Sequence, residues 1–157
     1  RVGLGEERYF GEGATSKELH REVEEHPGNV DAWISLASLI LGKAPDASQP
    51  AAVRQEVEDV GLNVLARALD HNPTAVPLWL IYLPLFARRS PLDLPDMLDH
   101  AVRLNPSSFL LWEKLVKSAD SDQGRAKAWL RAAKAALALH CAAVDARAAQ
   151  PLEPLER

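Results

Sequence analysis

Several features that define common protein classes are scarce or absent in this chain of 157 residues. The single cysteine, Cys141, excludes an internal disulfide, and with no N-glycosylation sequon the chain is expected to be intracellular. The net charge is -4, whereas nucleic-acid-binding domains are typically strongly basic. Apolar runs are interrupted well before the roughly 18 residues that a membrane-spanning helix needs, so no membrane partner is expected. Val, Ile, Thr and Tyr are few beside Ala and Leu, which favours helices over strands.

The chain begins at Arg1 rather than at Met, which we interpret as a piece of a longer protein with no recognisable signal peptide. Almost half of the residues are apolar, which is enough for one domain with a real core. We expect an N-terminal extension over residues 1–14, one helical repeat domain over 15–150 and a flexible tail over 151–157.

A repeated spacing of proline and tryptophan organises the sequence. In three segments a Pro is followed six residues later by a Trp: Pro27 and Trp33, Pro73 and Trp79, Pro106 and Trp112. The last two Trp residues are 33 residues apart and the first two 46 apart, so we predict a loop inserted near residues 43–50. Because Pro cannot continue a helix, each Pro is predicted to end one helix and each Trp to lie in the next.

The first helix of each pair is predicted over residues 16–25, 52–71 and 94–104, and the second over 31–41, 76–88 and 108–118. Thr15 with Glu18 makes a capping-box start, and Asn before the repeat Pro suits a left-handed turn at the helix end. Pro84 is expected to kink its helix or to cost it a hydrogen bond. A last helix over about 122–149 lacks the signature and is predicted to cover the final repeat.

These helix pairs predict an all-α fold, a right-handed α-α superhelix of about three TPR/HAT-like pairs and a capping helix. Apolar residues recur one turn after each Trp, so the indoles are predicted to pack between helices rather than to stack on bases. The predicted core is made by Trp33, Trp79, Trp112, Tyr82, Phe86, Leu65 and Leu98.

A helix pair of about 33 residues with Trp early in its second helix resembles half-a-TPR (HAT) repeats, which occur in RNA-processing scaffolds. The segments 61–72 and 78–89, with Arg8-Tyr9-Phe10 and residues 29–33, resemble the C-terminal repeats of large CCCH zinc-finger adaptors of the nuclear exosome. Those adaptors belong to the poly(A) tail exosome targeting complex. The resemblance covers about residues 8–141. It implies a nuclear scaffold in RNA decay, and the family's zinc finger and helicase-binding segment lie outside this chain.

No catalytic, cofactor or metal site is expected from the residues. The five His residues and Cys141 lack the short Cys/His spacings or the HExxH pattern of zinc sites. Cys141 lies in an Ala-rich helix, where a small buried thiol is the favoured interpretation. The Gly pairs near the N-terminus follow no strand and make no phosphate loop. We therefore expect a protein that is not an enzyme.

Two charged surfaces are candidate binding sites, each weighed against an ordinary solvated helix face. Equivalent positions on successive first helices are predicted to form a partner groove that grips an acidic peptide, made by Arg21, Arg67, Asp70, His100 and Arg103. A stripe of Lys127, Arg131 and Lys134 on the last helix, near Arg125, offers contacts to RNA phosphates, as do Arg88 and Arg89.

The predicted function is a protein–protein interaction scaffold that links the exosome's helicase machinery to proteins bound to polyadenylated RNA in the nucleus. The expected partners are exosome-adaptor or poly(A)-binding components. A homodimer is a further hypothesis, because a short array of repeats leaves its end helices exposed. The alternatives are a helical surface that binds RNA directly, and a HAT-repeat scaffold of a splicing or mRNA 3′-end processing complex.

Overall fold

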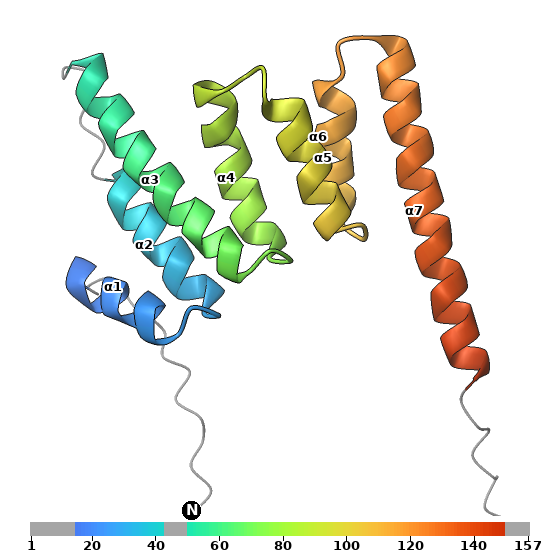
Figure 1. Cartoon of the computed structure of the whole chain (residues 1–157), viewed down its shortest axis with the longest axis horizontal. Helices are drawn as coiled ribbons and strands as arrows, with labels where there is room; N and C mark the ends of the chain where they lie inside the picture. The colour runs from blue at the N-terminus through green and yellow to red at the C-terminus, as the bar shows by residue number, and fades with distance from the viewer. Residues whose placement is uncertain (1–14, 43–49, 150–157) are drawn as a thin grey trace, which may run out of the picture. The chain divides into compact units, whose positions relative to one another are not determined.

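The structure, a computed structural model, describes residues 15–42 and 50–149, which form seven helices and no strand (Figure 1). The helices are α1 (Ser16–Glu25), α2 (Val30–Gly42), α3 (Ala51–His71), α4 (Val76–Arg89), α5 (Leu94–Leu104), α6 (Phe109–Ser118) and α7 (Asp122–Ala148). This confirms the predicted all-α class, and each predicted helix end lies within one residue of the observed one. The predicted extension over 1–14, the tail over 151–157 and nearly all of the inserted loop lie outside the described residues.

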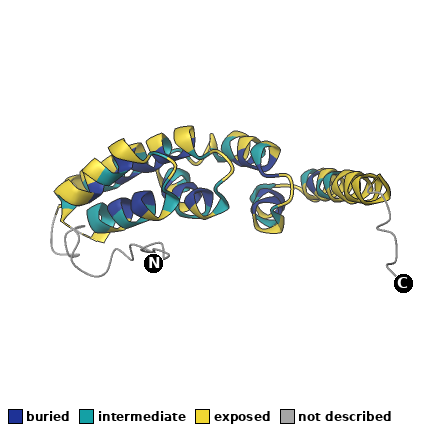
Figure 2. Cartoon of the chain, turned by 90° about the horizontal axis from the view of Figure 1, so that it is seen from below, coloured by how far each residue is buried: buried dark blue, intermediate teal, exposed yellow. Residues whose placement is uncertain are grey.

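The described residues fall into two compact units that meet in sequence between Arg89 and Ser90. In the first unit, α1 packs on α2, α2 on α3 and α3 on α4. In the second unit, α6 packs on both α5 and α7. Each helix of these pairs turns an apolar face to its neighbour, which Figure 2 shows as dark blue ribbon on the facing sides of the helices. Burial of these apolar stripes stabilises helices that would be marginal alone.

The indole of each repeat Trp is fixed by a hydrogen bond that explains its distance from the Pro. The Nε1–H of Trp33, Trp79 and Trp112 donates to the carbonyl oxygen of the Pro six residues earlier, at 2.9 Å in all three repeats. The six-residue spacing places the buried ring next to the turn. There its N–H meets a carbonyl that lies between two helices and accepts no hydrogen bond within either of them. A buried Trp needs such a partner, because an unpaired N–H would lose its hydrogen bond to water.

The first helices of the pairs do not end in the left-handed turn that the sequence predicted. Asn72 and Asn105 have φ angles of -132° and -130°. Instead, their side-chain amides donate to the carbonyls of Ala68 and Ala101, at 3.1 Å in both cases. The side chain thus adds a second donor to a carbonyl that already accepts from the backbone N–H of the same Asn, and the helix ends without a left-handed residue. The Asn72 amide also donates to the Pro27 carbonyl at 2.8 Å, which joins the first two helix pairs.

The start of α1 follows the predicted capping box. The Thr15 hydroxyl accepts from the Glu18 N–H at 3.4 Å, and the Glu18 carboxylate accepts from the Thr15 N–H at 2.8 Å. The hydrogen bond from the Thr15 backbone lowers the pKa of Glu18. Two of the free N–H groups at this helix end are therefore satisfied.

Six of the seven expected core residues are buried: Trp33, Trp79, Trp112, Tyr82, Leu65 and Leu98. Phe86 is only partly buried, so its expected place in the core is wrong. One residue earlier, Leu85 takes the inward position, and the Phe86 ring stacks on Tyr82 with 5.5 Å between ring centroids. The helix α4 continues through Pro84, which lies on its exposed side.

The Leu41 side chain of α2 packs directly against Gly61 of α3. A Cβ atom at this position would lie 2.6 Å from Cδ2 of Leu41. A glycine inside a helix lowers its stability by up to about 1 kcal/mol relative to Ala, so the contact with α2 explains its presence here.

Candidate functional site

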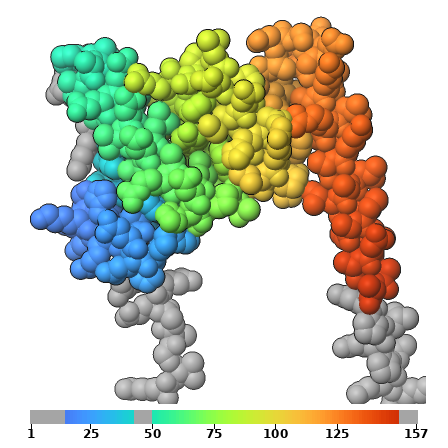
Figure 3. Space-filling view, in the orientation of Figure 1, coloured from blue at the N-terminus to red at the C-terminus, as the bar shows by residue number. Residues whose placement is uncertain are grey.

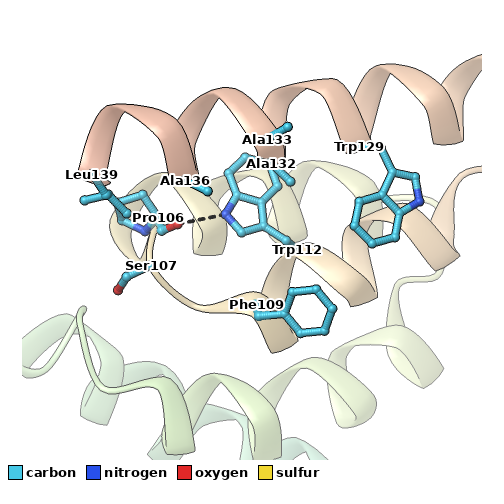
Figure 4. Close-up of a pocket in the computed structure, with 9 residues that line it drawn as sticks. All are labelled: Pro106, Ser107, Phe109, Trp112, Trp129, Ala132, Ala133, Ala136 and Leu139. Carbon is cyan, nitrogen blue, oxygen red and sulfur yellow. Dashed lines mark hydrogen bonds between the residues drawn. The ribbon is translucent and has the colours of Figure 1, made fainter. Parts of the chain in front are cut away.

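An apolar notch lies between α6 and α7 in the second unit (Figure 4). These helices are joined by a short turn, and the notch opens beside the start of α6. It has a volume of about 440 Å³. Its lining is almost entirely apolar: Pro106, Ser107, Phe109, Trp112, Trp129, Ala132, Ala133, Ala136 and Leu139.

Two aromatic rings on the rim of the notch remain exposed to solvent. Phe109 is 63% exposed and Trp129 is 48% exposed, with 6.4 Å between their ring centroids. Phe109 is the first residue of α6, directly after Ser108, whose hydroxyl caps the helix by accepting from the Leu111 N–H at 3.4 Å. Large exposed rings held by a capped helix and a packed helix form a preorganised apolar surface.

The sequence prediction missed both rim residues, although each left a signal. Phe109 lies three residues after its repeat Pro, a position taken by the smaller Val30 and Val76 in the other repeats. Trp129 is the fourth Trp and lies outside the Pro-to-Trp spacing, since residue 123 is Gln. These two positions depart from the repeat pattern together in one unit.

The inner wall of the notch is anchored to α5 through Arg131. The Arg131 guanidinium lies 5.6 Å from the centroid of the buried Trp112 ring and pairs with Asp99 of α5. Burial acts to raise the pKa of Asp99, but hydrogen bonds and positive charge from Arg131 and Arg103 outweigh it and lower the pKa below 3.8. Asp99 is therefore ionised at neutral pH and holds α5 against α7.

The polar side-chain groups that line the notch are the Ser107 hydroxyl and the indole N–H groups of Trp112 and Trp129. Within residues 15–42 and 50–149, no group of three or more His, Cys, Asp and Glu side chains is arranged to hold a metal ion. None of the helices described here combines the length and apolar character needed to cross a bilayer. The chemistry that the notch supports is burial of apolar side chains.

The residues of the predicted charged groove are divided between the two units. In the first unit, Arg21 pairs with Glu25 at 3.9 Å, and Arg67 covers the Trp33 ring at 5.9 Å from its centroid. Burial of Tyr82 raises its pKa, and the negative charge of the exposed Asp70 raises it further.

In the second unit, His100 and Arg103 are exposed on α5, and Arg103 pairs with Asp99. Neither unit alone brings all five predicted groove residues together. The role that the structure gives Arg67 is to pack on a tryptophan, and Arg131 has the same relation to Trp112 in the second unit.

Most cations considered for RNA are paired with carboxylates. Arg88 and Arg89 pair with Glu58 and Asp59, both at 3.1 Å. Arg125 pairs with Asp122, and Arg131 with Asp99 as described above. Lys127 and Arg131 line a second depression of about 400 Å³ beside Pro95 of α5. Cys141 is exposed, so the expected buried thiol is wrong; the buried residue of α7 is Ala128, near the other end of the helix.

Comparisons with known proteins agree with an RNA-related helical protein. A human protein described as "Zinc finger C3H1 domain-containing protein" is 35% identical over 95 residues, a stretch that covers 60% of this chain. That stretch spans 4% of the human protein's length. No solved structure matches the chain. The family described as "NRDE-2, necessary for RNA interference" matches residues 14–148, which is most of the sequence. This chain therefore belongs to the NRDE-2 family, a family of nuclear RNA-silencing proteins.

Proposed function

We propose that this chain is a protein-binding scaffold in nuclear RNA surveillance and that the notch between α6 and α7 receives apolar side chains of a partner protein. The observation that carries the proposal is the pair of half-exposed rings, Phe109 and Trp129, above a floor of alanines. Aromatic side chains around a preformed apolar depression dominate the energetics of many protein interfaces. The proposed occupant is a partner segment that presents Leu, Ile or Phe to this notch.

The proposed place in RNA decay rests on the family and on the CCCH zinc-finger relative. We propose that the partner is a component of the nuclear exosome's helicase machinery or a protein bound to polyadenylated RNA. The right-handed superhelix of stacked pairs stays a prediction, as does the scaffold role of the longer protein. A non-catalytic role stays a prediction from the sequence.

The test measures binding of the chain to purified nuclear exosome helicase and to purified poly(A)-binding protein by biolayer interferometry. Phe109→Glu places a charge at the rim but suits the first turn of α6, where an acid is favourable, so the fold is retained. We expect it to weaken binding by about 2 kcal/mol, roughly 30-fold. Leu92→Glu, at a residue that is 93% exposed, is the matched control and leaves binding unchanged.

Two results would reject parts of this proposal separately. Equal weakening by Phe109→Glu and Leu92→Glu removes the notch as the binding site. Lack of binding to both purified partners removes the link to the exosome, and components of splicing and 3′-end cleavage complexes then become the partners to test.

Direct RNA binding remains the second candidate because Lys127 and Lys134 lie together on α7. The ion pairs of Arg88, Arg89 and Arg125 argue against it, since a paired cation releases fewer counterions on binding phosphate. Filter binding to poly(A) at low salt distinguishes direct RNA binding from the protein-binding function. Tight binding that falls steeply with salt and is lost in Lys127→Glu would favour the RNA function.

A further inference from the structure

The turn between α4 and α5 carries a Ser-Pro dipeptide, Ser90-Pro91. The sequence has no other Ser or Thr that is followed directly by Pro. Pro91 also explains where α4 ends, because the residue before a proline is disfavoured in the helical region of φ and ψ. The helix therefore stops at Arg89, and Ser90 is its first residue outside. The Asp93 N–H donates to the Ser90 carbonyl at 3.2 Å and closes the turn.

The turn is open to solvent. None of residues 88–93 is buried, and Leu92 is 93% exposed. Figure 3 shows the segment between α4 and α5, in yellow-green, at the surface. The two compact units also divide directly before Ser90, so this segment can open locally without loss of either core. Another protein can therefore bind Ser90 and Pro91 in an extended conformation.

The residues before Ser90 are held by contacts that open at low cost. Arg88 pairs with Glu58 of α3 and Arg89 pairs with Asp59, each at 3.1 Å. Both arginine side chains are more than half exposed, and ion pairs at the surface contribute little to stability. The last turn of a helix also frays, since its final carbonyls have no partner within the helix.

An accessible Ser followed by Pro is the acceptor that proline-directed protein kinases recognise. Because Pro lacks a backbone N–H, an active site that selects it needs no hydrogen-bond acceptor for the position after the Ser. The kinase transfers the γ-phosphoryl group of MgATP. The Ser90 oxygen forms the new bond to phosphorus, the bond from phosphorus to the β,γ-bridging oxygen breaks, and ADP leaves. The hydroxyl proton passes to the catalytic Asp of the kinase.

We propose that Ser90 is a phosphorylation site for a proline-directed kinase and that the phosphate releases the end of α4 from α3. A phosphoserine carries a charge of about -1.5 to -2 at neutral pH and three acceptor oxygens. It follows Arg88 and Arg89 directly in the sequence, and so competes with Glu58 and Asp59 for their guanidinium groups.

Two effects of the phosphate act in the same direction on the last turn of α4. The new pairs with Arg88 and Arg89 form next to the phosphate, so they replace a link to α3 without adding another. The charge also lies at the C-terminal end of α4, where the helix dipole disfavours an anion. The notch between α6 and α7 takes no part, so this proposal and the proposed function can fail separately.

The first test is phosphorylation of the folded chain, with MgATP, by a purified mitogen-activated protein kinase and by a purified cyclin-dependent kinase. Mass spectrometry locates and quantifies the phosphate, and a synthetic peptide of residues 84–97 is the unstructured reference. With at least one kinase, we expect phosphate on Ser90 at a rate within about tenfold of that of the peptide, because the turn opens at low cost. Pro91→Ala is expected to lower the rate at least about tenfold in chain and peptide. Ser90→Ala removes the acceptor.

The second test is hydrogen exchange, followed by mass spectrometry, on the phosphorylated and the unmodified chain. We expect the amides of residues 85–89 to exchange at least about fivefold faster after phosphorylation, and those of α6 to be unchanged. The unmodified double variant Glu58→Gln/Asp59→Asn is the matched control. It removes the same ion pairs without adding charge beside α4, so a smaller increase is expected. Melting curves verify that all variants fold.

Each part of the proposal has a result that overturns it. Phosphate on Ser90 in the peptide but not in the folded chain, or in neither, removes the turn as a kinase site. Equal rates for wild type and Pro91→Ala exclude a proline-directed kinase. Unchanged exchange of residues 85–89 in the phosphorylated chain refutes the release of α4 from α3.

Discussion

Replacement of Trp33 tests the link between the Pro-to-Trp spacing and the stability of the helix pairs. The ring is 1% exposed, and removing a fully buried Trp to Ala costs about 3–5 kcal/mol through lost burial and the cavity that remains. Trp33→Ala also removes the donor to Pro27, the contact with Arg67 and the stacking on His71 at 6.2 Å. We expect a loss near the upper end of this range.

Trp33→Phe separates the hydrogen bond from the burial. It keeps most of the apolar volume and loses the indole N–H, so the expected cost is about 1–2 kcal/mol. The Pro27 carbonyl keeps the Asn72 amide as a donor, which limits the loss. The cost of Trp112→Phe is expected to be larger, because Trp112 Nε1 is the described donor to Pro106.

The assay is urea unfolding followed by circular dichroism at neutral pH. Trp129→Ala is the matched control, because the same change at a half-exposed ring is expected to cost less than about 1 kcal/mol. If Trp33→Ala and Trp129→Ala destabilise the chain equally, the indole at position 33 is not the wedge between helices described here. A cost below about 1 kcal/mol for Trp33→Ala would lead to the same conclusion.

Two further changes test contacts inside each unit. Asp99→Asn is expected to lower the free energy of unfolding by about 1 kcal/mol at pH 7, because it breaks the pair with Arg131. The pKa of Asp99 is lowered in the folded state, so the difference from wild type is present above about pH 4 and disappears as the pH falls through the folded pKa. A difference in urea unfolding that persists at pH 2 would contradict the ion pair. Gly61→Leu is expected to lower the stability of the chain by about 1–3 kcal/mol in thermal unfolding, because the new side chain would force α3 away from Leu41. Gly42→Leu is the control, since no atom lies within 4 Å of a Cβ at that position. Equal melting of the two variants would refute the close approach.

The helices could be predicted from the sequence because their ends are encoded locally. Pro27, Pro73 and Pro106 stop one helix and set the start of the next, and Thr15 with Glu18 supplies a complete cap. Burial of the repeat Trp residues followed from the apolar residues one turn later. These signals depend on neighbours within about one helical turn, so no tertiary information was needed.

The notch could not be predicted because it depends on which side of α7 faces α6. The sequence of α7 is apolar around most of its circumference, so periodicity does not indicate one packing side. The charged groove was a prediction from repeat positions alone. It did not anticipate that Arg67 packs on Trp33. Contacts between side chains from different helix pairs decide both questions, and a repeat pattern does not contain them.

The carbonyl of Pro27 accepts from two donors, Trp33 of its own pair and Asn72 of the next. Neighbouring pairs thus share an acceptor in the turn between helices. Loss of structure in either pair deprives the other of a partner at this atom, which makes the two melt together rather than independently. A proteolytic cut or a splice junction that separates residue 27 from residue 72 should therefore loosen both pairs at once.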